Sequence, residues 1–144
     1  MVSVTPMEDL NREGLERKKI VNIVLYARDS DILANMQGII ARLMPKAHTE
    51  LYRTTETFAE SLRKSVYDST VAVILAADKD DLRDLSSLQQ LLWGTRMILV
   101  LPDAGDETVA LGHSLRPRFI SSRDDGLENV AAVLGKMLEN GNSK

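Results

Sequence analysis

The chain has 144 residues, a formal net charge of −3 at pH 7 and no cysteine. Its length is typical of one domain, and 44% hydrophobic with 27% charged residues is typical of a folded, water-soluble protein, not of a collagen-like or disordered one. The lack of cysteine excludes a disulfide framework, a thiolate nucleophile and a cysteine metal site. The acidic balance argues against a nucleic-acid partner.

The two ends of the chain are polar. Residues 1–17 have few large apolar side chains and no sustained period, which predicts an N-terminal tail with a short helix around 7–16. Residues 140–144, NGNSK, predict a second tail, so we expect the folded domain to occupy residues 18–139. No apolar run approaches the roughly 20 residues that span a bilayer, and the N-terminus lacks the apolar core of a signal peptide. We therefore expect a cytoplasmic protein that makes no contact with a membrane.

The domain begins with a strand predicted at 20–27. Its sequence, IVNIVLYA, is almost continuously aliphatic or β-branched, which is typical of a central strand that is buried on both faces. A helix follows at 32–43, because apolar residues recur there at intervals of three and four after the capping residues 28–31. Pro45 ends this helix, since proline cannot continue helical hydrogen bonding.

The remaining elements repeat this alternation of apolar strand and amphipathic helix. We predict strands at 48–53, 71–77, 97–101 and 119–121, and helices at 54–67, 82–92, 107–115 and 126–139. The polar second strand is typical of a sheet edge, the third strand, VAVILAA, is typical of a central position, and the short last strand is peripheral. Five strand–helix units with short connections predict a three-layer α/β/α sandwich around a parallel sheet.

Polar residues follow the predicted strands at their carboxyl ends, the edge at which open parallel sheets bind ligands. This edge contains Arg28, Asp29, Asp78, Asp103, Ser121 and Arg123. Arginines beside acids are able to recognise a small phosphorylated or carboxylated molecule. Solvated loop charges are the plainer explanation. A Walker phosphate loop, a dinucleotide-binding glycine motif and a Ser–His–Asp arrangement are all missing from the sequence.

The order, length and connections of these elements resemble the receiver domain of bacterial response regulators from Lys18 to Leu138. The resemblance implies a flavodoxin-like, five-stranded parallel sheet with strand order 2-1-3-4-5. In that family an acidic pair after the first strand helps to bind Mg²⁺, and an Asp after the third strand accepts a phosphoryl group. The oxygens of this group contact a hydroxyl side chain after the fourth strand and a Lys after the fifth strand. The matching residues here are Ala27 and Arg28, Ala76, Leu101, and Ser122 or Ser121.

These matching residues cannot perform the chemistry of the family. Alanine has no nucleophile, leucine cannot donate a hydrogen bond to a phosphoryl oxygen, and arginine repels a metal ion. We therefore expect a degenerate, non-catalytic pseudo-receiver of two-component signal transduction that needs no cofactor and acts by protein–protein interaction. The resemblance implies a partner or homodimer face made of the fourth helix, fifth strand and fifth helix, within 107–118 and 128–144.

An alternative is a functioning receiver. If the third strand is shifted by two residues, Asp78 becomes the phospho-acceptor and Asp29 one ligand of Mg²⁺. This shift leaves the missing hydroxyl and lysine unexplained. The competing interpretation is that Asp78, Asp80 and Asp81 cap the third helix and complement its dipole. In the same way, Asp29 and Asp31 are then acids in the first turn of the first helix.

Overall fold

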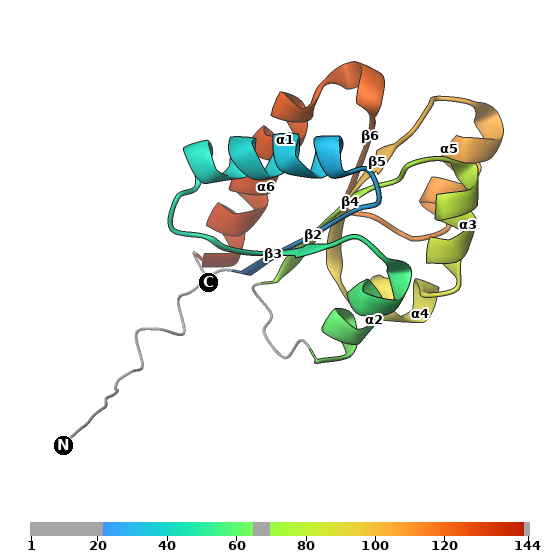
Figure 1. Ribbon diagram of the computed structural model, residues 1–144, viewed down its shortest axis with the longest axis horizontal. Coiled ribbons are helices and arrows are strands. Elements are labelled where there is room, and N and C mark those ends of the chain that lie inside the picture. The colour runs from blue at the N-terminus through green and yellow to red at the C-terminus, as the bar shows by residue number, and fades with distance from the viewer. Residues whose placement is uncertain (1–21, 65–69, 143–144) are drawn as a thin grey trace.

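A computed structural model describes residues 22–64 and 70–142 of the chain (Figure 1). Its strands are β2 (Asn22–Ala27), β3 (His48–Tyr52), β4 (Val71–Leu75), β5 (Arg96–Leu101) and β6 (Phe119–Ser122). Its helices are α1 (Ser30–Leu43), α2 (Thr55–Lys64), α3 (Lys79–Ser86), α4 (Gln89–Trp93), α5 (Asp106–His113), the 3-10 turn η2 (Arg123–Asp125) and α6 (Leu127–Asn142). Within the described ranges, no helix is long and apolar enough to cross a membrane.

The strands form one parallel sheet. Its order is β3-β2-β4-β5-β6, or 2-1-3-4-5 counted along the chain, which confirms the expected topology. Parallel neighbours require a crossover connection, and the helices supply it. β3 and β6 lie at the edges, as their polar or short sequences predict. β4 lies at the centre and all five of its residues are buried, which explains its continuous apolar sequence.

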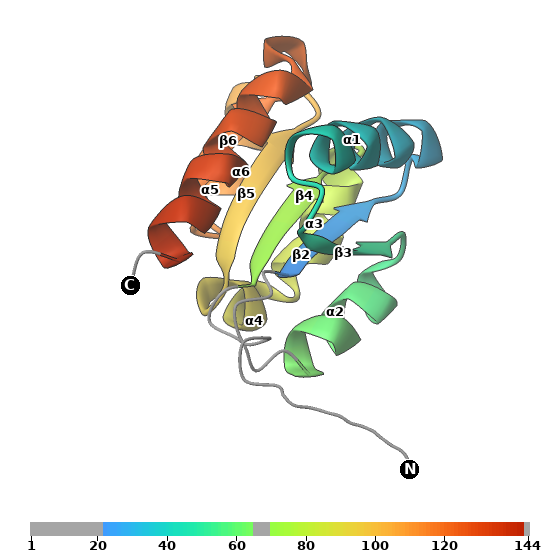
Figure 2. The same cartoon turned by 90° about the vertical axis from the view of Figure 1, so that its left-hand side faces the viewer.

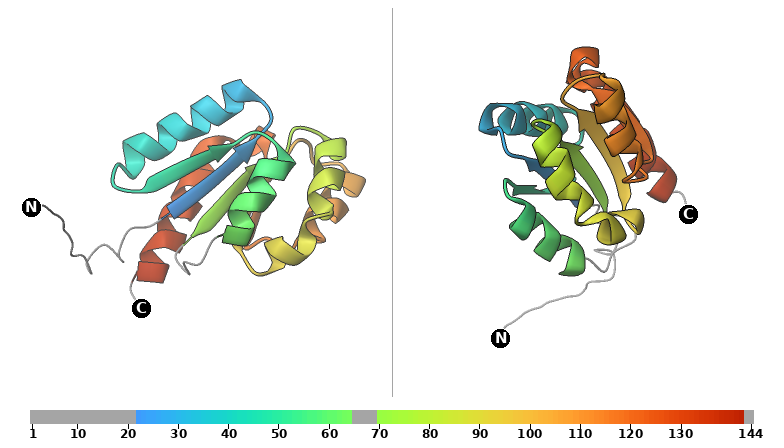
Figure 3. Two further views of the ribbon diagram at one scale, coloured as in Figure 1. Left: turned by 60° about the horizontal axis from the view of Figure 1, so that its bottom comes forward. Right: turned by 90° about the vertical axis from the view of Figure 1, so that its right-hand side faces the viewer.

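Two helix layers cover the sheet and divide the core in two. α1 and α6 pack on one face, and α2, α3, α4 and α5 pack on the other (Figure 2; Figure 3). Alternate residues of each strand serve opposite faces, so Leu25 joins the core under α1 while Val24 and Tyr26 join the other. Each fully buried Leu or Ile side chain contributes about 1.5–3 kcal/mol, so these two cores supply most of the stability.

The prediction of one helix at 82–92 is wrong, because this segment forms two helices, α3 and α4. The hydroxyls of Ser86 and Ser87 donate to carbonyl oxygens of the preceding turn at distances of 2.6 to 3.1 Å. Serine hydroxyls that bond in this way compete with the helical backbone and favour a bend or an end. The leucine spacing carries no sign of the break, since leucines on both sides of it are buried.

β4 is two residues shorter than the predicted strand at 71–77. The amide of Ala76 still donates to the carbonyl oxygen of Val100 in β5, at 3.0 Å. The next amide, that of Ala77, donates instead to a carboxylate oxygen of Asp81 in α3, also at 3.0 Å. The strand ends here because a side chain takes over the hydrogen bond that a neighbouring strand would have made.

The other predicted bounds agree within a few residues. α1 has Asp29 as its N-cap and ends before Pro45. α6 continues to Asn142, three residues past its predicted end and into the segment expected to be a C-terminal tail. The expected N-terminal tail, the first residues of the domain and of its first strand, and Val66 of the second helix lie outside the described residues.

Candidate functional site

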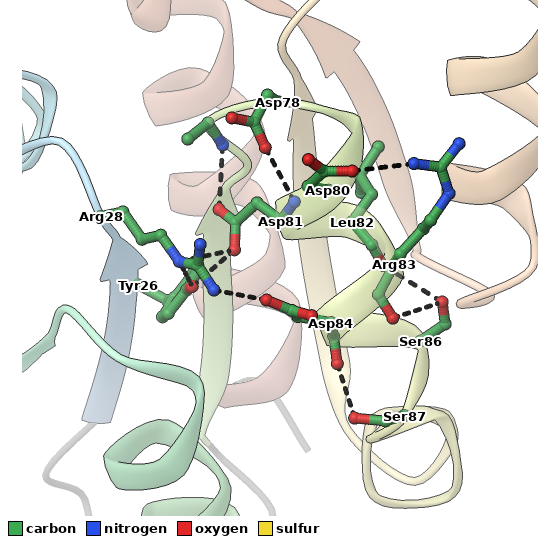
Figure 4. Close-up of polar contacts among 11 residues, drawn as sticks. Tyr26, Arg28, Asp78, Asp80, Asp81, Leu82, Arg83, Asp84, Ser86 and Ser87 are labelled. Carbon is green, nitrogen blue, oxygen red and sulfur yellow. Dashed lines mark hydrogen bonds and ion pairs between the residues drawn. The ribbon is translucent and has the colours of Figure 1, made fainter.

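The carboxyl edge of the sheet centres on a group of side chains between β2 and α3 (Figure 4). Arg28 extends from the end of β2 to α3, where its Nε lies 3.1 Å from Asp81 Oδ1 and its Nη2 lies 2.6 Å from Asp84 Oδ2. Tyr26, inside β2, donates its hydroxyl to Asp81 Oδ1 at 2.7 Å. We name these four residues, Tyr26, Arg28, Asp81 and Asp84, the edge network.

The local sequence explains why Asp81 faces inward. Asp78 is the N-cap of α3 and accepts a hydrogen bond from the amide of Asp81 at 2.8 Å, which fixes the first turn. Asp81 precedes the buried Leu85 by four residues and so lies on the same face of the helix. Asp81 is 0% exposed, and its second oxygen accepts from the amide of Ala77. Asp81 lies in the first turn of α3, as expected of an acid near the helix N-terminus, but the expectation that it caps the helix is wrong, because its carboxylate is buried and held by three donors.

Burial and hydrogen bonding fix the charge states of two members of the edge network. Burial raises the pKa of Tyr26 well above its usual value near 10, and the hydrogen bond to Asp81 adds to this increase. The hydrogen bond to Asp84 raises the pKa of Arg28 above its usual high value. Tyr26 is therefore a neutral donor and Arg28 a cation throughout the neutral pH range.

The positions that match the receiver active site are mostly apolar and buried. Ala27, Ala76 and Leu101 are at most 3% exposed and belong to the two cores. Ser122 is nearly buried and forms a capping box with Asp125 across η2. The end of β4, where a receiver has its phospho-acceptor, thus presents a methyl group inside the core.

Arg123 is the charged side chain that reaches the end of β4. It follows β6 directly, and its Nη2 donates to the carbonyl oxygen of Ala76 at 3.2 Å. Its Nε is buried and has no hydrogen-bond partner within the described residues. A cationic group therefore lies beside Ala76, although serine stands at the position that matches the family's lysine.

Other acids of the predicted ligand edge accept backbone amides. The side chain of Asp29 accepts from the amides of the first turn of α1, the nearer at 2.9 Å. Asp103 accepts from the amide of Gly105 at 2.8 Å, and this bond holds the pKa of its carboxyl below the usual value. Asp78 is the N-cap of α3, which confirms the capping interpretation of this residue. Asp31 lies in the first turn of α1 as expected, whereas Asp29 is the N-cap of that helix and not one of its first-turn acids.

The carboxyl edge fits a divalent metal ion poorly. In the described part of the chain, no cluster of three or more His, Asp or Glu side chains is placed to hold a metal. Arg28 brings a positive charge to Asp81, whereas Mg²⁺ needs several free oxygen ligands in octahedral geometry. Ser121, another predicted edge residue, is nearly buried and lies 3.3 Å from a carboxylate oxygen of Asp125. These donors differ from the ligand set that the family uses for Mg²⁺.

A hollow of about 500 Å³ lies beside the edge network, between the end of β3 and α3. It is lined by Arg28, Arg53, Thr54, Thr55, Glu56, Asp84 and Ser87. The guanidinium of Arg53 donates to the carbonyl oxygen of Arg28 at 3.2 Å. The acids in this hollow balance its two arginines, so its charge does not favour an anion. The sequence did not predict this hollow, because Arg53 and Thr54 follow a polar edge strand, and nothing in that strand indicated a site.

Arg28 is the one member of the edge network whose sequence position predicted a place at a ligand edge. The position of Asp81 four residues before Leu85 is a signal that could have identified its burial. Tyr26 carries no comparable signal, because tyrosine is common in apolar strands and its hydroxyl finds a partner only when α3 packs beside β2. Asp84 likewise looks like an ordinary surface acid.

The sheet order, the two helix layers and the polar loops at one edge define the fold of a response-regulator receiver domain, and the chain has this fold. The signal receiver domain of an HD domain-containing protein from Pseudomonas fluorescens Pf-5 is 17% identical, with a TM-score of 0.68 over 87% of this chain and 91% of its own. A CheY-like receiver domain protein from Methanospirillum hungatei JF-1 is 16% identical, with a TM-score of 0.62 over 84% of this chain and 98% of its own.

A third structure is similar over only part of its length. The response regulator DrrB of Thermotoga maritima is 17% identical, with a TM-score of 0.64 over 85% of this chain and 54% of its own. At these identities the similarity concerns the fold. No protein-family model matches the sequence, and no curated protein matches it either.

Proposed function

We propose that this chain is a pseudo-receiver: a non-catalytic signalling module with the receiver fold that binds other proteins and is not phosphorylated on aspartate. The end of β4 carries this proposal. Buried Ala76 stands there in place of the phospho-acceptor, and the Arg123 guanidinium donates to its carbonyl oxygen. An alanine cannot form an acyl phosphate, because it has no carboxylate to attack phosphorus.

The state of Asp78 supports the same proposal. This residue is the acceptor in the alternative of a functioning receiver. Its Oδ1 accepts the amide of Asp81 as the N-cap of α3, and this bond competes with attack on phosphorus. The positive charge of Arg28 opposes a metal ion at the same edge.

Intact mass measurement after incubation with acetyl phosphate and Mg²⁺ tests the proposal. We expect no phosphoryl adduct on the wild-type chain, while a receiver with its acidic residues intact, treated in parallel, confirms that the reagent is active. An adduct that is lost in Asp78→Asn and kept in the matched variant Asp80→Asn would establish the functioning receiver and refute the pseudo-receiver.

The partner-binding face that we assign is formed by α5, β6 and α6. Receivers often use the corresponding face for dimerisation or output. β6 is an edge strand with no strand beyond it in the described sheet, and its Phe119 and Ile120 are only half-buried. Without a phosphoryl switch, binding to this face is what selects the active state. A second copy of the chain is the simplest partner.

A further inference from the structure

The carboxyl edge carries a cation that belongs to the chain itself. Arg28 stands at a position where the resemblance places a carboxylate ligand of Mg²⁺, so the sign of the charge is inverted there. Its Nε lies 3.1 Å from Asp81 Oδ1 and 3.2 Å from the hydroxyl of Tyr26, and its Nη2 lies 2.6 Å from Asp84. One side chain thus joins the end of β2 to two turns of α3 (Figure 4).

The two ion pairs of Arg28 differ in environment. The Asp84 side chain is 54% exposed, and an ion pair in such a position contributes little. Asp81 is 0% exposed, and a carboxylate removed from water is strongly unfavourable unless a counter-charge and hydrogen-bond donors compensate for it. Tyr26 and Ala77 supply neutral donors, so among the described contacts of Asp81 the counter-charge comes from Arg28.

We infer that the Arg28 guanidinium is a permanent internal counter-ion that takes the place of the divalent metal and fixes α3 to the end of β2. A guanidinium suits this role because it is planar, always charged, and bonds several acceptors at once. The arrangement of the carboxyl edge is therefore independent of Mg²⁺. This inference rests on the proposed function and specifies its regulation: the edge is held in one arrangement, and partner binding is what regulates the module.

A double-mutant cycle tests the counter-ion role. We expect Arg28→Met to lower the melting temperature by at least about 6 °C, since it leaves a buried charge uncompensated. Arg28→Met with Asp81→Asn should lose clearly less than the sum of the two single substitutions, because the neutral amide that replaces the carboxylate needs no counter-ion. Arg83→Met is the matched control: Arg83 also forms two ion pairs, to Asp80 and Glu107, but both are exposed.

Additive losses in the cycle, or a loss in Arg28→Met no larger than in Arg83→Met, would overturn the inference. If Arg28→Met does not fold, the double variant decides the question. The inference requires that Asp81→Asn restores folding to Arg28→Met, and a double variant that also fails to fold contradicts it.

The metal arm compares the melting temperature of the wild-type chain in millimolar MgCl₂ and in chelator at equal ionic strength. We expect a difference below about 1 °C. Clear stabilisation by Mg²⁺ would overturn the inference, because it shows that the edge takes an external cation. This failure is distinct from failure of the proposed function, which appears as a phosphoryl adduct in the mass measurement and leaves the double-mutant cycle unaffected.

Discussion

Tyr26 joins the carboxyl edge to the core. Its ring packs against Phe58 with the centroids 5.1 Å apart, while its hydroxyl donates to Asp81 at 2.7 Å. An aromatic side chain with a polar tip suits this place because it fills a core position and still supplies a hydrogen bond. The edge network therefore depends on a residue whose apolar and polar parts serve different ends.

We expect Tyr26→Phe to lower the free energy of unfolding by about 1–3 kcal/mol, because the change keeps the ring and removes one donor from a buried carboxylate. Urea denaturation measures this loss. The matched control is Tyr52→Phe, whose hydroxyl donates to Glu50 at 2.9 Å on the exposed edge strand. That substitution should cost less than about 0.5 kcal/mol. Equal losses in the two variants would contradict a special role for Tyr26.

The raised pKa of Tyr26 predicts that the difference in stability between the wild-type chain and Tyr26→Phe depends on pH. In the unfolded chain this phenol loses its proton near pH 10, whereas in the folded chain it keeps the proton to higher pH. The unfolded state therefore binds fewer protons than the folded state above pH 10. The stabilisation that comes from the raised pKa of Tyr26 is complete below pH 10 and declines as the pH increases above it. The advantage of the wild-type chain over Tyr26→Phe should shrink between about pH 10 and 11. A difference that stays constant over this range would argue against the shift.

At the scale of the elements, the sequence predicted the strands better than the helix ends. Hydrophobic pattern predicted the five strands, because the buried strands of a parallel sheet between helix layers are continuously apolar. Their order was implied by the resemblance to receiver domains and is confirmed by the sheet. The hydrophobic pattern failed between α3 and α4, where the hydroxyls of Ser86 and Ser87 decide the geometry and the leucine pattern continues unchanged. The position of Arg28 after the first predicted strand indicated an edge residue but not its partners, since the contact with Asp81 exists only after α3 has packed beside β2.

At the scale of the whole molecule, contacts far from the edge network order the loop between α5 and β6, beside the assigned partner face. The loop between α5 and β6 carries Arg116, whose guanidinium lies 3.9 Å from the centroid of the Trp93 ring. The indole of Trp93 donates to the carbonyl oxygen of Ser114 at 3.2 Å, and Arg116 adopts a left-handed backbone conformation with φ of 58°. These contacts fix the loop before any partner arrives, which reduces the entropy lost on binding.

A preformed face on α5, β6 and α6 predicts that a bulky charge on α5 weakens association without unfolding the chain. Ala110 is exposed on α5, and Ala41 is also exposed, on α1, away from the assigned face. We expect the wild-type chain to form a reversible dimer in sedimentation velocity runs over a range of concentrations. Ala110→Arg should weaken the dimer at least about tenfold, because a large cation at an interface must be desolvated and accommodated. Ala41→Arg should leave the dimer unchanged. A monomeric wild-type chain at high concentration, or equal weakening by both substitutions, would contradict a homodimer through this face.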